Sequence, residues 1–304
     1  MSPDPIAFET RFPPERAARP ARVSPLTRRL VAPNGGPFTH TGTCAYIVGS
    51  DDVAIIDPGP RSEAHVESLL GAITGERLAA ILVTHTHLDH APAAALLRAR
   101  TGAPIIGCAP HRSLDARKIE GPALDAVHDA AYAPDKVLED GETLRVGGAM
   151  LQAIATPGHT ANHLCFALIE EQTLFTGDHV MGWATTVVAP PDGSMRAYLG
   201  SIEKLLARDD RLYWPAHGGP VADPRPFLRA LLLHRRSREA AILRRLAEGD
   251  STIPPMVAKI YAGVDKRLHP AAAMVVLAHL EDLLERGVVA APDGLGLFAR
   301  YEKV

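Results

Sequence analysis

The chain has 304 residues, of which 46% are hydrophobic and 22% charged, and its formal net charge is −3. These values are ordinary for a globular protein, so they exclude a disordered chain, a collagen and a coiled coil. The near-neutral charge provides no general attraction to nucleic acid or to an anionic membrane surface. Histidine is the unusual component, because its 14 residues outnumber the 7 Phe and 2 Trp together. Metal binding would explain such an excess, and the positions of the histidines along the chain indicate whether they can form a metal site.

Cysteine content and the terminal segment indicate a cellular compartment. The three cysteines, Cys44, Cys108 and Cys165, are far apart and form no Cys-x-x-Cys motif, which favours a reducing environment. The first residues contain no apolar stretch long enough for a signal peptide. The longest apolar run, at 271–278, is far shorter than the ~20 residues that span a bilayer. We therefore expect a soluble, cytoplasmic protein without a membrane partner.

The first half of the chain alternates strand and helix patterns. Residues 1–22 are rich in Pro and Arg and predict an extended arm. Short apolar runs then alternate with helical segments, which predicts an α/β sandwich. The expected elements are a hairpin at 44–48 and 53–56, a helix at 61–73, a strand at 79–83, a helix at 91–99 and a strand at 104–108.

The second half repeats this β-rich pattern, which indicates a second, similar unit. Two strands are expected within 143–154, separated at Gly147-Gly148, and a hairpin is expected at 163–169 and 173–176. A helix at 194–207 and a short strand at 212–214 complete this unit.

The character of the sequence changes after residue 220. Helices are expected at 226–247, 254–261 and 270–286, and a terminal hairpin at 288–291 and 296–301. Three helices followed by a hairpin is the order of a winged helix, with a plain helical cap as the alternative. We therefore divide the chain into the arm at 1–22, a main domain at 23–222 and a winged-helix-like domain at 223–304.

A dense group of potential metal ligands follows the predicted strand at 79–83. His85, His87, Asp89 and His90 lie within six residues, in a loop where α/β folds collect functional groups. Buried without a partner, each would cost roughly a few kcal/mol. Around a cation they would form a coordination shell, because imidazole and carboxylate are ligands for zinc, iron and related ions. Glycine-bounded turns carry three further candidates, which are His159, Asp178 and His217.

This ordered set resembles the motifs of the metallo-β-lactamase-fold hydrolases over roughly residues 23–222. The segments 31–49 and 176–191 and the tail after residue 222 are similar to the subgroup that carries a C-terminal winged helix. The resemblance implies a four-layer αββα sandwich that binds two divalent metal ions, expected to be zinc, with iron or manganese as alternatives. It implies that His85, His87 and His159 hold the first metal, that Asp89, His90 and His217 hold the second, and that Asp178 bridges them.

Two positions depart from relatives of this fold. Cys44 stands where the subgroup is expected to have Asn after Gly-Thr, which affects a local hydrogen bond and not the metal site. Zinc-dependent β-lactamases often place a Cys in the second site, whereas this ligand set contains only His and Asp. Antibiotic hydrolysis is therefore not the expected primary role.

The expected reaction is hydrolysis by a metal-bound hydroxide. Two divalent ions ~3.5–4 Å apart can hold a bridging water and lower its pKa towards ~7. Asp89 is the expected catalytic residue, because a free carboxylate oxygen can orient the hydroxide or accept its proton. The expected substrate is a small-molecule thioester or ester, since relatives with a similar ligand set cleave hydroxyacyl-glutathione thioesters.

Three other functions compete with this one. Some winged-helix relatives cleave single-stranded RNA, so an endoribonuclease is the main alternative. The helix at 270–286 is net acidic and ill suited to groove recognition, and the arginines at 235–245 are expected to form a solvated face. We therefore expect the tail to be structural or to contribute to a homodimer. A non-catalytic binding protein and an iron-dependent oxidoreductase are the remaining alternatives.

Several residues near the motifs have two interpretations. Asp57 either supports the His85–His90 loop or caps a turn, and His163 is placed to support the site or only to pack near it. His179 is expected to point away from Asp178. Trp183, Thr185 and Thr186 either line the substrate cleft or pack beneath the sheet edge. The histidines that match no ligand motif are expected at the surface or in the core, and these are His40, His65, His111, His128, His234, His269 and His279.

Overall fold

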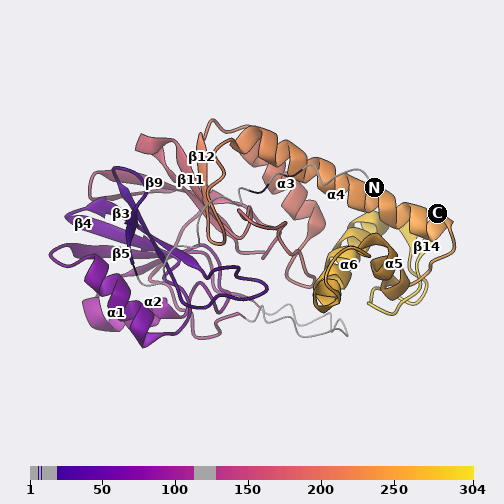
Figure 1. The fold of residues 1–304 in the computed structure, drawn as a ribbon, viewed down its shortest axis with the longest axis horizontal. Coiled ribbons are helices and arrows are strands. Elements are labelled where there is room, and N and C mark those ends of the chain that lie inside the picture. Colours follow the sequence, from indigo (N-terminus) through magenta and orange to yellow (C-terminus); the bar gives the residue numbers. More distant parts are fainter. Residues whose placement is uncertain (1–5, 7, 9–18, 113–127) are drawn as a thin grey trace.

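Two β-sheets packed face to face, with helices outside them, form the larger part of the molecule (Figure 1). The structure is a computed structural model, which describes residues 6, 8, 19–112 and 128–304. Most of the arm expected at 1–22 lies outside the described residues. The described part of the chain contains no helix both long and apolar enough to cross a membrane.

The first sheet has seven strands in sequence order. They are β1 (Ala21–Arg22), β2 (Thr27–Val31), β3 (Cys44–Ser50), β4 (Asp52–Ile56), β5 (Arg77–Val83), β6 (Ile105–Gly107) and β7 (Lys136–Val137). From β4 onward the strands are parallel, and α1 (Glu63–Ala72) and α2 (Ala93–Thr101) provide the crossovers that parallel neighbours need. The carboxyl ends of β4, β5 and β6 therefore lie at one edge of the sheet.

The second sheet has five strands in the order β12-β11-β10-β9-β8. These are β8 (Thr143–Val146), β9 (Ala149–Ala155), β10 (Leu164–Leu168), β11 (Thr173–Gly177) and β12 (Leu212–Pro215), with the 3-10 helix η1 (Ile169–Glu171) and α3 (Met195–Leu206) between them. The turn that joins β8 to β9 contains Gly147 and Gly148, as the sequence predicted.

The core between the two sheets contains large aromatic side chains. Tyr46 of β3 packs against Phe175 of β11 at 4.9 Å and Trp214 of β12 at 6.0 Å between ring centroids. Nearly every residue of β3 and β4 is buried, because these strands are covered by the second sheet on one face and by helices on the other. The predicted αββα sandwich is confirmed.

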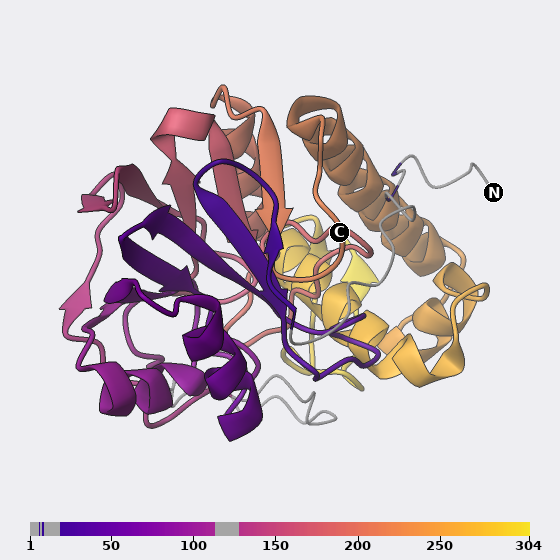
Figure 2. The same ribbon diagram turned by 60° about the vertical axis from the view of Figure 1, so that its left-hand side comes forward.

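The C-terminal part consists of three α-helices and a short hairpin. Its elements are α4 (Pro224–Ala247), α5 (Ile253–Ile260), the 3-10 helix η2 (Lys266–Leu268), α6 (His269–Glu285), β13 (Val289–Ala290) and β14 (Glu302–Lys303). Leu228 and Leu231 of α4 pack with α3 and the second sheet, whereas Ile242 belongs to a separate core formed by residues 242–301. Figure 2 shows these orange and yellow helices beside the second sheet. Helix α4 thus connects both parts of the molecule.

The second strand of the terminal hairpin was predicted at the wrong place. It spans Glu302–Lys303 and not 296–301. The cause is Tyr301, which is buried and whose hydroxyl donates to the carbonyl of Gly296 and accepts from its N–H. These two bonds close residues 296–301 into a turn, so pairing with β13 begins only after Tyr301.

The interpretation of the α4 arginines was also wrong for Arg235, whose side chain is buried with 2% of its surface exposed. Other arginines of this helix are engaged with neighbours. Arg238 lies over the ring of Tyr261, and Arg245 pairs with Glu248 and Asp250. Arg236 and Arg244 are exposed, as expected, so the solvated face contains only part of this arginine set.

A buried histidine in α6 makes the stability of the fold depend on pH. His279 is 1% exposed, and neither ring nitrogen has a hydrogen-bond partner among the described residues. Burial, reinforced by the charge of Arg235, lowers the pKa of His279 to about 3. The unfolded chain, with a histidine pKa of about 6.5, takes up this proton more readily, so stability falls as the pH drops below that value.

We expect His279→Met to remove the part of this pH dependence that comes from His279, while other buried histidines such as His65 and His179 keep their contributions. Between pH 7.5 and pH 5.0 the wild-type chain should lose about 2 kcal/mol more unfolding free energy than the variant. Urea unfolding at the two pH values measures this difference. His269→Met, at the start of the same helix, is the control and should behave as the wild type. Equal losses in the wild type and in His279→Met would contradict the assignment.

Candidate metal centre

All seven predicted ligands converge at one edge of the sandwich. They come from loops that follow β5, β9, β11 and β12, and so from both sheets. Because the carboxyl ends of neighbouring parallel strands lie at the same edge, β11 and β12 bring the loops of Asp178 and His217 together. The ligand atoms form two clusters with Asp178 between them.

The first cluster consists of His85, His87 and His159. The Nδ1 atom of His87 lies 3.0 Å from Nε2 of His85 and 3.1 Å from Nε2 of His159. Burial, reinforced by the neighbouring imidazoles, lowers the pKa of His85 and His87 well below the usual range. The three rings present nitrogen atoms to a common point, and at least His85 and His87 do so in the neutral form.

Hydrogen bonds fix which ring nitrogens face this point. The Nδ1–H of His159 donates to the carbonyl of Val187 at 2.7 Å, so in the neutral ring Nε2 carries the lone pair. The hydroxyl of Thr84 donates to Asp57, so it accepts from Nδ1 of His85 at 2.9 Å and leaves that Nε2 unprotonated too. Without a cation these lone pairs would repel one another, so the donor set fits a metal ion.

The second cluster consists of Asp89, His90 and His217. The Oδ2 atom of Asp89 lies 3.2 Å from Nε2 of His90 and 3.1 Å from Nε2 of His217. Burial disfavours the charged form of Asp89, but the adjacent His90 and His217 outweigh it and hold its pKa well below the usual range. This cluster thus combines two imidazoles with a carboxylate.

Asp178 directs one oxygen to each cluster. Its Oδ1 lies 3.5 Å from Nε2 of His90 and 3.3 Å from Nε2 of His217, and its Oδ2 lies 3.6 Å from Nε2 of His159. Both Oδ1 of Asp178 and Nε2 of His90 are buried without a hydrogen-bond partner among the described residues. Such atoms are costly unless a cation satisfies them, so the arrangement can hold two divalent ions.

Asp57 combines the two roles that the sequence left open. Its Oδ1 accepts from the backbone N–H of Thr84 at 2.8 Å, as a turn cap would. Its Oδ2 accepts from the hydroxyl of Thr84 at 2.7 Å and from Nδ1 of His90 at 3.0 Å. Asp57 therefore orients His90 directly and His85 through Thr84.

His163 supports the backbone at Asp178. Its Nε2 accepts from the N–H of Asp178 at 3.2 Å, and its Nδ1–H donates to the hydroxyl of Thr156 at 2.8 Å. Gly177 has φ of +48°, and a Cβ there would lie 2.6 Å from the His163 ring, so glycine is required. His179 packs against Tyr198, at 4.9 Å between ring centroids, and forms no part of either ligand cluster.

The residues after Asp178 serve different purposes. The hydroxyl of Thr186 donates to the carbonyl of Asp178 at 2.7 Å, so Thr186 supports the site and does not line a cleft. Trp183 stacks on His40 with ring centroids 5.0 Å apart, and Thr185 is half-buried. His40 belongs to the loop 34–43, which contacts the second cluster through Thr43 and Gly42.

Two histidines outside the ligand motifs lie beside the centre. His128 packs on His87 at 4.8 Å and stacks face to face on His111 at 3.5 Å between ring centroids. Asp192 lies 3.4 Å from Nε2 of His128 and 3.7 Å from Nδ1 of His111. Parallel rings direct their lone pairs side by side and not to one point, so we interpret this group as a His–Asp network that supports His87.

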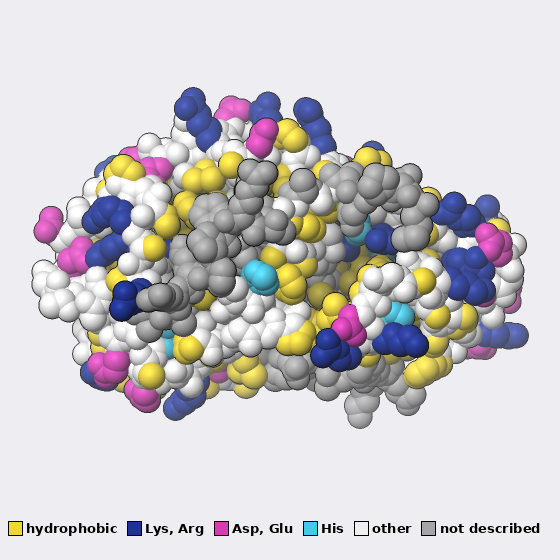
Figure 3. Space-filling model, viewed as in Figure 1, with side chains coloured by type: hydrophobic (Ala, Val, Ile, Leu, Met, Phe, Trp, Pro, Cys, Tyr) yellow, Lys and Arg dark blue, Asp and Glu magenta, His cyan; other side chains and the backbone are white. Residues whose placement is uncertain are grey.

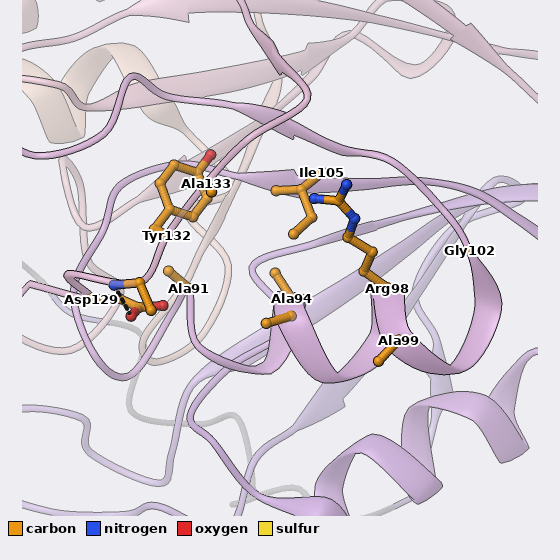
Figure 4. A pocket seen from close by; sticks show the side chains of 11 residues that line it. Ala91, Ala94, Arg98, Ala99, Gly102, Ile105, Asp129, Tyr132 and Ala133 are labelled. Atoms are coloured by element: carbon orange, nitrogen blue, oxygen red, sulfur yellow. Dashed lines mark hydrogen bonds between the residues drawn. The ribbon is translucent and has the colours of Figure 1, made fainter.

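A cavity of about 410 Å³ lies beside α2 and contains none of the predicted ligands. Figure 4 shows it bordered by small side chains of α2, including Ala94 and Ala99, and by Tyr132. Arg98 at its edge is paired with Asp135. This cavity is therefore separate from the metal centre.

Comparisons with known proteins identify the family and the fold. Residues 39–217 match the family model of the metallo-beta-lactamase superfamily, and residues 252–295 match that of the beta-lactamase associated winged helix domain. An atrochrysone carboxyl ACP thioesterase from Claviceps purpurea (strain 20.1) is 29% identical over 79% of this chain and 73% of its own length. A beta-lactamase-like protein 2 homolog from Caenorhabditis elegans is 29% identical over 89% of this chain and 88% of its own.

A solved structure has the same architecture over almost the entire chain. It is a metallo-beta-lactamase family protein from Thermus thermophilus, with a TM-score of 0.74 and 25% identity over 93% of this chain and 100% of that one. The two family matches together span both the sandwich and the C-terminal helices. The chain therefore belongs to the metallo-beta-lactamase superfamily and is a hydrolase of that superfamily with a C-terminal winged helix domain.

Proposed function

We propose that the protein hydrolyses a small-molecule thioester or ester with the help of two divalent metal ions. The observation that carries this proposal is the position of Asp178, whose two oxygens face two different clusters of buried ligands. The first ion would be held by His85, His87 and His159, and the second by Asp89, His90 and His217. Zinc suits imidazole and carboxylate ligands, and iron and manganese accept the same ligand types.

The metal ions and Asp89 would have different roles in the proposed reaction. Bound divalent ions supply a water of lowered pKa as the nucleophile and polarise the carbonyl of the substrate. Asp89 is the more exposed of the two acidic ligands, with 27% of its side chain accessible against 11% for Asp178. It is therefore the more accessible to solvent, and with the metal ions bound its carboxylate would orient the water and accept its proton. The hydroxyl of Thr43, 3.4 Å from Oδ2, helps to hold Asp89 in place.

Two exposed apolar side chains, one in the ligand motif and one in the loop 34–43, support an uncharged acyl group as substrate. Leu88, inside the ligand motif, is 43% exposed, and Phe38, in the loop 34–43, is 36% exposed. The stacked rings of His40 and Trp183 connect this loop to the segment after Asp178. Exposed apolar side chains beside a polar centre suit binding of an apolar ligand. The thioesterase name of the Claviceps purpurea relative points to the same bond type.

The distribution of charge favours this substrate over RNA. A ribonuclease needs basic side chains along the path of the phosphate backbone. In Figure 3 the coloured Lys and Arg side chains are scattered among acidic ones and form no single track on the face shown. Arg235 is buried and Arg245 is paired with two acids, so these two arginines of α4 are not free to form such a path.

The division into domains and the compartment are further parts of the proposal. The boundary at 222/223 is supported by the separate apolar core of residues 242–301, although α4 contacts both parts.

None of the three cysteines forms a disulfide, and all are buried. Three thiols without a disulfide are typical of a cytoplasmic protein, which is the location we propose.

The test is hydrolysis of a matched substrate panel by metal-loaded protein. The panel contains an acyl thioester, the oxygen ester of the same acyl group, a phosphodiester and a single-stranded RNA oligonucleotide. We expect turnover of the thioester or the ester, and its loss in His85→Ala. His65→Ala, a buried histidine outside both clusters, is the control and should retain turnover if folded. Cleavage of the RNA alone would overturn the proposal.

A further inference from the structure

One buried charge lies outside the metal centre and faces it from the C-terminal helices. Arg235 of α4 is 2% exposed, and its guanidinium lies 5.0 Å from the centre of the Tyr198 ring. Among the described residues no carboxylate pairs with it, and its Nε has no hydrogen-bond partner. Burying a guanidinium without a carboxylate partner is costly, and an apolar side chain would fill the space more favourably. This cost points to a role beyond packing.

The hydrogen bond that Arg235 forms within the described chain leads to the segment next to the metal centre. Its Nη2 donates to the carbonyl of Thr186 at 2.5 Å. The hydroxyl of the same Thr186 donates to the carbonyl of Asp178 at 2.7 Å and to that of His179 at 3.1 Å. Arg235 is thus two hydrogen bonds away from the residue that connects the clusters.

The residue after Thr186 contacts a second ligand. The carbonyl of Val187 accepts the Nδ1–H of His159, which directs Nε2 of His159 toward the first cluster. Residues 186 and 187 therefore support two predicted ligands, Asp178 and His159, through two different bonds. Val188 packs in the core shared by α3 and α4, and Ala189 packs on the C-terminal core. This segment lies between the sandwich and the helices.

We propose that Arg235 is a positioning residue for the metal centre: by holding the carbonyl of Thr186, it fixes the segment 186–187 and, through it, Asp178 and His159. The inference rests on the proposed function, because it takes these two residues as metal ligands. It assigns a specific task to the C-terminal part of the chain, which reaches the site through α4. The first metal is the more dependent on Arg235, because only the first cluster contains His159.

The test compares two matched arginine variants. Arg238 lies on the same helix, at 4.9 Å from the centre of the Tyr261 ring, and its hydrogen bond goes to Ile260 and not to the metal centre. Arg235→Met and Arg238→Met remove similar cation–ring contacts. Zinc affinity is measured by competition with a chromogenic chelator, and unfolding free energy by urea titration of the metal-free proteins.

We expect Arg235→Met to weaken zinc binding by about tenfold or more, a typical loss for residues that orient metal ligands. Arg238→Met should bind zinc as the wild type does. Arg235→Lys keeps one donor and the charge, so its affinity should lie between those of wild type and Arg235→Met. Two results would overturn the inference: unchanged zinc affinity in folded Arg235→Met, or equal losses in both Met variants. Absence of zinc, iron and manganese binding in the wild type would instead refute the proposed function.

Discussion

Replacing Asp178 by Ala is expected to lower turnover by about 10³-fold or more and to release most of the bound metal. The variant removes the only carboxylate whose two oxygens face both clusters among the described residues. It also removes one of the two carboxylates shared by Nε2 of His90 and of His217, and leaves only Asp89 beside them. Elemental analysis of the purified variant and its rate of thioester hydrolysis measure the two effects.

A surface aspartate provides the matched control. Asp209 is 85% exposed and pairs with Arg225 at the surface, so Asp209→Ala should retain wild-type metal content and turnover. An Asp178→Ala protein that is folded, fully loaded with metal and active at the wild-type rate would refute the assignment of this residue.

The second large effect is expected for Asp57→Asn. The amide can still accept from the N–H of Thr84, but its NH₂ group cannot accept from the hydroxyl of Thr84 or from Nδ1 of His90. His90 and His85 then lose the bonds that orient them. We expect metal affinity to fall by about 10–100-fold. Competition with a chelator measures the change.

Asp52 lies at the other end of the same strand and is the control for this substitution. It forms an exposed ion pair with Arg77, so Asp52→Asn should leave metal affinity unchanged. If Asp57→Asn and Asp52→Asn bound metal equally well, Asp57 would be only a turn cap.

Local sequence patterns were sufficient to identify the residues that the structure brings together at this edge. Strand β5 is a continuous apolar run, and the motif from His85 to His90 follows it directly, so the ligand loop could be placed at the sheet edge. His159, Asp178 and His217 each follow a strand and lie in a glycine-bounded turn. Turns of this kind restrict which residues they can contain, which makes such positions recognisable without the structure.

The supporting contacts could not be predicted, because they join segments that are far apart in the chain. Arg235 bonds to Thr186 across 49 residues, and Asp57 to His90 across 33. One signal for Arg235 was present: Leu228, Leu231 and Arg235 follow helical spacing, so Arg235 shares the buried face of the two leucines. The network of His111, His128 and Asp192 has no such pattern. The turn at Tyr301 has no such pattern either. There the hydrogen bonds of a side chain, and not local propensity, keep residues 296–301 out of the predicted strand.

The central claim is that bound divalent ions are required for hydrolysis and that two are needed. The most direct measurement is turnover of an acyl thioester by chelator-stripped protein while zinc is added in known amounts. The account predicts no turnover in the stripped protein and a rise that reaches its plateau when two ions are bound per chain. Turnover by the stripped protein at the rate of the reloaded protein would contradict it.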